Sequence, residues 1–175
     1  HLMKTSKISV SAENVLITPG AKQALLYSYM TVLNPSDEAI LLSPSWASYE
    51  PMISIIGGVP VNVPVDRKNF HPDMDAIRSS ITDRTRMIMV NSPCNPTGAV
   101  YTREEIEEIV SIAIEHDLWI ISDEIYSRLI WNGGEHVSPA TIEGGKERTI
   151  VISGWSKTWA MTCLLYTSPS PRDTG

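Results

Sequence analysis

Lys157, in the segment SGWSKTW, is the residue with the clearest potential for covalent chemistry. It follows an apolar run and stands between two tryptophans, Trp155 and Trp159. Desolvation disfavours the ammonium form of a lysine, lowers its pKa and leaves a nucleophilic neutral amine. The segment therefore makes Lys157 a candidate nucleophile, although most lysines are solvated surface groups.

Asp123, in ISDEIYSRLI, is the second candidate. It closes an apolar run that contains Ile120 and Ile121, where an unpaired charge is costly. We therefore expect a cation beside Asp123. We expect Glu124 to be a solvated neighbour, and Tyr126 to be either a hydrogen-bond donor to a ligand or a packing residue.

Three further loops contain groups that bind ligands. In ITPGAKQAL, Gly20 permits a sharp turn before a helix whose free N–H groups at Ala21 and Lys22 can hold a phosphate. In SPSWASYE, Trp46 either offers a flat face to an aromatic ligand or caps the core. In VNSPCNPTGAV, prolines fix the backbone on both sides of Asn95, whose amide can donate and accept. Each loop also has an ordinary structural interpretation.

Alternating secondary-structure elements must position these groups. Apolar segments at 38–42, 59–63, 86–91, 118–122 and 149–153 predict strands, and amphipathic segments at 20–33, 47–56, 72–80 and 103–116 predict helices. For the last helix, Thr102 and Glu105 predict a capping box. Nearly continuous apolar strands are typical of a mostly parallel α/β sheet, whose ligands bind at the carboxyl ends of the strands.

Composition favours a small-molecule ligand. The 175 residues are 42% hydrophobic and have a net charge of -6, without a Lys/Arg-rich run, which disfavours nucleic acid and anionic membranes as partners. Cys94 and Cys163 cannot form a disulfide framework, and they show no metal-ligand spacing with the four histidines, so we expect a cytoplasmic protein without a metal. The apolar runs fall far short of the roughly 20 residues of a membrane helix.

The segments GAKQAL, SPSWASY, NSPCNPTG, SDEIY and SKTWAMT, in this order, resemble the class I/II, aspartate aminotransferase-like family of pyridoxal 5'-phosphate enzymes. The resemblance runs from about Val15 to Thr162. It implies the large domain of a fold type I enzyme, with a mostly parallel sheet sandwiched by helices and truncated at both ends. It also implies amino-group transfer between an amino acid and a 2-oxo acid by a homodimeric parent protein, but it does not indicate which amino acid is the substrate.

The resemblance further implies roles around the cofactor ring. Lys157 would hold pyridoxal 5'-phosphate as an internal Schiff base and then shuttle the α-proton of the substrate. Asp123 would keep the pyridine nitrogen protonated. Asn95 and Tyr126 would hydrogen-bond to the phenolic oxygen, and Trp46 would stack on the ring.

Phosphate binding is implied for the backbone of Ala21 and Lys22 and for the Ser156 hydroxyl. The family often has Ser or Thr three residues before the lysine, where this chain has Gly154. A phosphate contact is then either missing or supplied by Ser153.

The resemblance stops within a motif. After Thr162 the family continues with Gly, Trp and a phosphate-binding Arg, whereas this chain continues with Cys163, Leu164 and Leu165. We therefore expect residues 1–14 to be the remnant of an upstream segment, 15–162 a partial large domain, and 163–175 a foreign, disordered tail. We expect this polypeptide alone to be inactive and to bind the cofactor weakly.

Two alternatives share these motifs. A pyridoxal-phosphate carbon-sulfur lyase would differ mainly in its substrate contacts. An aminotransferase-like sensor domain of a transcription regulator would follow a basic DNA-binding segment, of which residues 1–13 show no trace.

Overall fold

The computed structural model describes residues 8–131 and 133–162, so the proposed tail at 163–175 and residues 1–7 of the proposed upstream remnant lie outside the described residues. Its five strands form one parallel sheet in the order β2-β1-β3-β4-β5. The strands are β1 Glu38–Ser43, β2 Val59–Pro64, β3 Thr85–Asn91, β4 Trp119–Asp123 and β5 Thr149–Ile152. All five predicted strands are thus confirmed, and so is the mostly parallel sheet.

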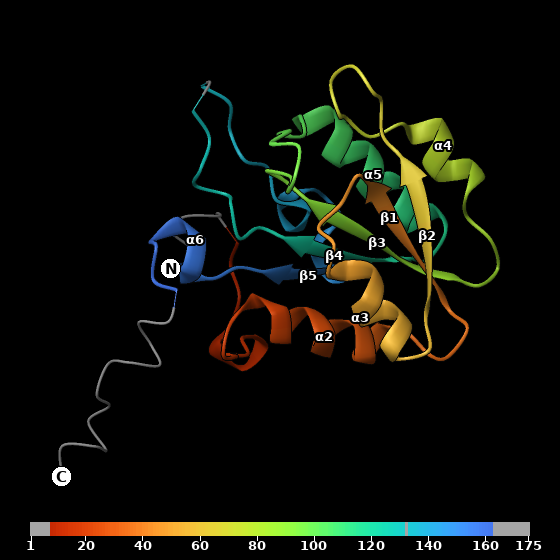
Figure 1. Ribbon diagram of the computed structural model, residues 1–175, viewed down its shortest axis with the longest axis horizontal. Helices are drawn as coiled ribbons and strands as arrows, with labels where there is room; N and C mark the ends of the chain where they lie inside the picture. Colours follow the sequence, from red (N-terminus) through yellow and green to blue (C-terminus); the bar gives the residue numbers. More distant parts are fainter. Residues whose placement is uncertain (1–7, 132, 163–175) are drawn as a thin grey trace, which may run out of the picture.

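Helices cover both faces of the sheet (Figure 1). The α-helices are α2 Ala21–Val32, α3 Tyr49–Ile55, α4 Met74–Ser79, α5 Arg103–Glu115 and α6 Trp155–Thr158. Short 3-10 turns occur at η1 Ala12–Asn14, η2 Pro139–Thr141 and η3 Lys146–Arg148. Helices α2 and α3 lie on one face, and α4 and α5 lie on the other. The four predicted helices are confirmed, with ends that differ by at most two residues.

Two apolar layers hold the helices to the sheet, because successive strand side chains point to opposite faces. Ile40 of β1 packs in the layer beneath α4 and α5, whereas its neighbour Leu41 packs in the layer with α2 and α3. The edge strand β2 is more exposed than the four others.

The capping box of α5 is present as predicted. The Thr102 hydroxyl accepts from the backbone N–H of Glu105 at 3.3 Å, and the Glu105 carboxylate accepts from the backbone N–H of Thr102 at 2.7 Å. Ile106 and Ile109 then face the core. Helix α5 ends at Glu115, and Asp117 adopts a left-handed turn conformation with φ of 56° before β4.

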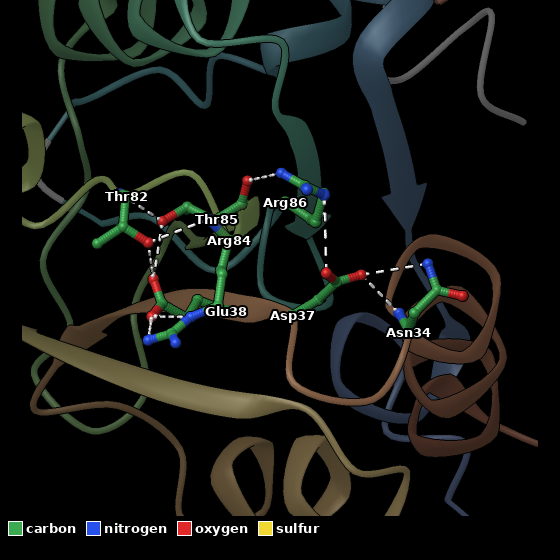
Figure 2. Close-up of polar contacts among 7 residues, drawn as sticks. All are labelled: Asn34, Asp37, Glu38, Thr82, Arg84, Thr85 and Arg86. Atoms are coloured by element: carbon green, nitrogen blue, oxygen red, sulfur yellow. Dashed lines mark hydrogen bonds and ion pairs between the residues drawn. The ribbon is translucent and has the colours of Figure 1, made fainter.

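A polar cluster fixes β1 to β3 at the amino-terminal end of the strands (Figure 2). The buried Glu38 carboxylate accepts from Thr82 Oγ1 at 2.6 Å, from Arg84 Nη2 at 2.8 Å and from Thr85 Oγ1 at 3.2 Å. Hydrogen bonding, from Thr82 first and then from Arg84, lowers the pKa of Glu38. These contacts favour the register in which Ile40 pairs with Ile88.

The carboxyl ends of the inner strands are aligned as a result. Asn91, Asp123 and Ile152 are successive partners across β3, β4 and β5. From β1 the chain adds β2 on one side of the sheet, and it then adds β3, β4 and β5 on the other side. At such a switch point the loops that follow the two neighbouring strands, here β1 and β3, diverge and leave a crevice. The sheet thereby positions the loops on which the sequence places its candidate residues.

Candidate functional site

A cavity of about 390 Å³ opens at the carboxyl edge of the sheet. The structure brings all eight predicted site residues to its wall: Ala21, Lys22, Trp46, Asn95, Asp123, Tyr126, Ser156 and Lys157. The other lining residues are Gly20, Leu25, Tyr49, Ile125 and Thr162. The lining comes from the start of α2, from α6 and from the segments that follow β1, β3 and β4.

Asp123 is buried at 4% exposure, at the end of β4. Its Oδ2 accepts from the Tyr49 hydroxyl at 2.8 Å, and its Oδ1 accepts from the backbone N–H of Ile125 at 3.2 Å. Desolvation raises the pKa of Asp123, and the hydrogen bond from Tyr49 is the largest opposing effect. Among the described residues no cationic side chain pairs with it. The predicted burial is confirmed, and the expected cation is not supplied by the described part of the chain.

Tyr49 is a site residue that the sequence reasoning missed. It is the first residue of α3, its side chain is buried, and its hydroxyl is the donor to Asp123. Burial first, and the charge of Asp123 second, raise its pKa, so the phenol keeps its proton and remains a donor. Its position in SWASYE could have marked it as a site residue, because it lies three residues after Trp46 and near the start of the expected helix.

Asn91 is the second residue that was missed. Its Nδ2 donates to the backbone carbonyl of Asp123 at 2.9 Å, and its Oδ1 accepts from the backbone N–H of Asn95 at 2.8 Å. One buried amide therefore joins the loop after β3 to the end of β4. This bridge depends on the pairing of β3 with β4, and that pairing cannot be predicted from one sequence.

Trp46 is half-buried and contacts two other groups of the cavity wall. Its ring meets the Tyr49 ring edge to face, with centroids 5.3 Å apart and planes at 85°. The Nζ of Lys22 lies 5.1 Å from the Trp46 ring centroid, in a cation–π contact. The side chain of Lys22 is therefore part of the site as well as its backbone.

The amino-terminal end of α2 has the geometry of an anion site. Gly20 adopts φ of 107° and ψ of 162°, and no side chain of the described residues caps the helix by a hydrogen bond. The first N–H groups of a helix carry partial positive charge and can bind a phosphate. Ser156 lines the same cavity, whereas Ser153, the suggested substitute, is exposed and lies outside the lining.

Lys157 differs from the expectation. Its side chain is exposed, and the flanking Trp155 and Trp159 are 48% and 51% exposed, so the prediction that two indoles desolvate the amine is wrong. Trp159 instead faces the guanidinium of Arg128, whose Cζ lies 5.3 Å from the ring centroid. Thr158 Oγ1 donates to the Ile125 carbonyl at 3.3 Å and so holds α6 near Asp123.

Glu124 also differs from the expectation. The sequence suggested a solvated carboxylate, but the side chain is 1% exposed. Ser122 and Ser138 donate to it, and His136 lies beside it. The apolar pattern of β4 gave no sign that two consecutive carboxylates are buried.

Other classes of site have no support in the described ranges. No group of three or more His, Cys, Asp or Glu residues in 8–131 and 133–162 could hold a metal ion. Within the same residues, no helix has the length and apolar character required to cross a membrane.

Comparison with known proteins gives one consistent result. Residues 1–164 match the family described as "Aminotransferase class I and II". The aspartate/prephenate aminotransferase of Thermus thermophilus is 44% identical over 156 residues, and the match covers 89% of this chain and 40% of that protein. The aspartate aminotransferase of Musicola paradisiaca is 44% identical over 151 residues and is covered to 38%.

Solved structures agree with these relatives. The aspartate aminotransferase from Thermus thermophilus with maleate superposes with a TM-score of 0.88 at 42% identity, and the match covers 92% of this chain and 42% of that one. The aromatic aminotransferase from Pyrococcus horikoshii gives a TM-score of 0.89 at 40% identity, with 44% of that chain covered. The chain thus spans about 40% of the length of the curated relatives it matches.

Proposed function

The chain belongs to the aminotransferase class I and II family, and we propose from this that it forms the cofactor-binding part of a pyridoxal 5'-phosphate-dependent aminotransferase. The reaction proposed is transfer of an amino group between an amino acid and a 2-oxo acid. Because the chain spans less than half of its relatives, the complete reaction is proposed for a protein that contains this segment together with the parts its relatives add.

One observation supports the cofactor assignment most strongly. Asp123 is a buried carboxylate on the wall of the cavity, and among the described residues it has hydrogen-bond donors but no cationic partner. A buried carboxylate without a counter-charge is costly, so the arrangement suits a ligand that brings a cation, such as a protonated pyridine nitrogen. The donor set of the cavity therefore fits the cofactor of this family.

The remaining groups suit the other parts of the cofactor. The N–H groups of Ala21 and Lys22 and the hydroxyl of Ser156 would hold its phosphate. Asn95 and Tyr126 would donate to its phenolic oxygen.

Trp46 would lie against the face of the ring. It is already fixed by Tyr49 and Lys22, which favours a preset surface.

Lys157 is proposed as the covalent and proton-transferring residue. Its exposed side chain lines the cavity, where it would hold the cofactor through the aldehyde carbon and would accept and return the proton of the substrate α-carbon. When bound, pyridoxal 5'-phosphate supplies an electron-accepting ring that stabilises the charge left at that carbon. Tyr49 and Asn91 keep Asp123 in place during this transfer.

The finer assignments belong to the same proposal. The names of the relatives include aspartate, aspartate/prephenate and aromatic amino acid aminotransferases, and we propose amino acids with their 2-oxo acids as the substrate class. A homodimeric assembly and a cytoplasmic location are proposed for the complete protein, from the family resemblance and from the cysteine usage.

The carbon–sulfur lyase and the sensor domain have less support. The relatives described above carry aminotransferase names, and no observation of the cavity favours elimination of a sulfur group or sensing without turnover.

A chimera tests the proposed reaction directly. Residues 15–162 would replace the matching segment of the Thermus thermophilus relative, and release of the 2-oxo acid would be measured with a panel of amino acids including aspartate. We expect transfer activity that a Lys157→Ala chimera loses by about 10²–10⁴-fold, the range for losing a general acid–base group. A folded chimera that binds the cofactor without transferring amino groups would contradict the proposal.

A further inference from the structure

Helix α6, which carries Lys157, is too short to hold its position by itself. It has four residues, and isolated helices shorter than about 12–15 residues are marginal in water. The side chains of Trp155, Lys157 and Trp159 are exposed, so no apolar face of α6 is deeply buried against the sheet. The place of α6 at the cavity therefore depends on contacts with a neighbouring segment, residues 125–128, which follows the end of β4.

Ile125 joins α6 to the carboxylate of Asp123. Its backbone N–H donates to Asp123 Oδ1 at 3.2 Å, and its carbonyl accepts from Thr158 Oγ1 at 3.3 Å. A β-carbon added at Gly154, the residue before α6, would lie 2.9 Å from Ile125 Cδ1, so the backbone passes close to this side chain. Ile125 therefore contacts the buried carboxylate on one side and both ends of α6 on the other.

Arg128 and Trp159 make a further contact between the two segments, at the surface. The Cζ of Arg128 lies 5.3 Å from the centroid of the Trp159 ring, in a cation–π contact, and both side chains are exposed. Trp159 directly follows the last residue of α6. Together with Ile125 and Thr158, these two residues form what we call the α6 seat.

We propose that Arg128, Thr158 and Trp159 are positioning residues for the lysine of α6. They hold α6 against the segment after β4 and so fix the Lys157 amine relative to Asp123, which lines the same cavity. The use made of the seat rests on the function proposed above, whereas the contacts that form it do not.

The surface contact between Arg128 and Trp159 sets the size of the effect. An exposed cation–π contact changes a local equilibrium about 2- to 5-fold. Its loss should lower the population in which α6 is seated by that factor. The fold as a whole should be unaffected, because both side chains are exposed.

Hydrogen exchange in the cofactor-free chain, followed by NMR, measures the seat itself. The backbone N–H of Met161 donates to the Trp155 carbonyl at 3.3 Å, so its exchange rate reports opening of the turn after α6. We expect this rate to rise about 2- to 5-fold in Arg128→Gln and in Trp159→Leu. The double variant should exchange no faster than either single variant, because the two side chains act through one contact. Arg128→Lys keeps a cation over the ring and should return the rate toward that of the wild type.

Labelling with pyridoxal measures the consequence for Lys157. Pyridoxal lacks the phosphate, so the charge of Arg128 has no anion of the probe to attract. After borohydride reduction, peptide mass spectrometry gives the ratio of label on Lys157 to label on Lys22. We expect this ratio to fall about 2- to 5-fold in Arg128→Gln and to recover in Arg128→Lys. A general loss of stability would change both labels together, because both lysines line one cavity.

Two exposed residues elsewhere serve as matched controls. Arg103 on α5 lies beside Glu107, with 3.7 Å between Nη1 and Oε1, and Trp131 is 82% exposed. Arg103→Gln and Trp131→Leu should leave both the exchange rate of Met161 and the labelling ratio unchanged.

Three results would overturn the proposal: equal effects of Arg128→Gln and Arg128→Lys, additive effects of the Arg128 and Trp159 substitutions, or an unchanged exchange rate of Met161. Failure of the proposed function gives a different result. The wild type would then take up no label at Lys157, while the exchange rate of Met161 would still rise in Arg128→Gln and so support the seat.

Discussion

At the scale of the residue, the cavity is organised around a carboxylate that the fold stabilises incompletely. Asp123 has one strong donor, Tyr49, and its backbone carbonyl is held by Asn91. Desolvation still dominates and raises its pKa. A buried group that costs stability is expected at a functional site more than in a structural core.

Asp123→Asn should therefore stabilise the chain at neutral pH. Because the folded-state pKa of Asp123 is raised above 3.8, its unfavourable effect is absent below pH 3.8 and grows as pH rises through the folded-state value. Guanidinium unfolding at several pH values should show that the free energy of unfolding of the variant increases relative to that of the wild type as the pH rises. Asp83 is exposed, so Asp83→Asn is the matched control, and its free energy of unfolding should match that of the wild type at each pH. A variant that is less stable than the wild type at pH 7 would contradict this account.

At the scale of the element, the start of α2 shows how backbone conformation prepares a site. Gly20 occupies φ of 107° with ψ of 162°, a region that is essentially restricted to glycine, and no other heavy atom lies within 4 Å of a β-carbon added there. Any cost of a side chain at this position therefore comes from backbone strain, with no steric clash.

Gly20→Ala should lower the free energy of unfolding by about 1–3 kcal/mol. It should also turn the N–H groups of Ala21 and Lys22 away from an anion, so the affinity for pyridoxal 5'-phosphate should fall more than the affinity for pyridoxal, which lacks the phosphate. Fluorescence titration with both ligands separates the two effects.

Gly134→Ala is the control for this substitution. An added β-carbon there lies 3.5 Å from Ile130 Cγ2, an ordinary contact, so stability should change by less than about 0.5 kcal/mol and neither affinity should change. Equal losses of affinity for both ligands in Gly20→Ala would contradict a phosphate site at α2.

At the scale of the whole molecule, the sequence was sufficient to predict the helices and strands. It was insufficient to predict the surroundings of individual side chains. Strands such as β3 and helices such as α5 followed from apolar periodicity and from the Thr102 cap. The partners Tyr49 and Asn91 could not be predicted, because they contact Asp123 across strand and helix pairings that are distant in sequence. The burial of Glu124 and the exposure of Lys157 were wrongly predicted, because both depend on which segments pack over the strand ends.

The loops that carry the site residues converge at one edge of the sheet. Eight residues chosen from five separate segments line one cavity, because parallel strands release their loops at the same end of the sheet. Two of the eight, Lys22 and Lys157, carry amines, so the cavity also allows a direct test of which amine reacts.

The most direct test is to mix the purified chain with pyridoxal 5'-phosphate, reduce it with borohydride and locate the fixed label by peptide mass spectrometry. We predict an absorbance band on mixing and a label that reduction fixes to Lys157. The Lys157→Ala variant should lack both, whereas Lys22→Ala should keep both and bind the cofactor more weakly. A label on Lys22, or equal labelling of the wild type and Lys157→Ala, would contradict the assignment of this cavity as a pyridoxal 5'-phosphate site built around Lys157.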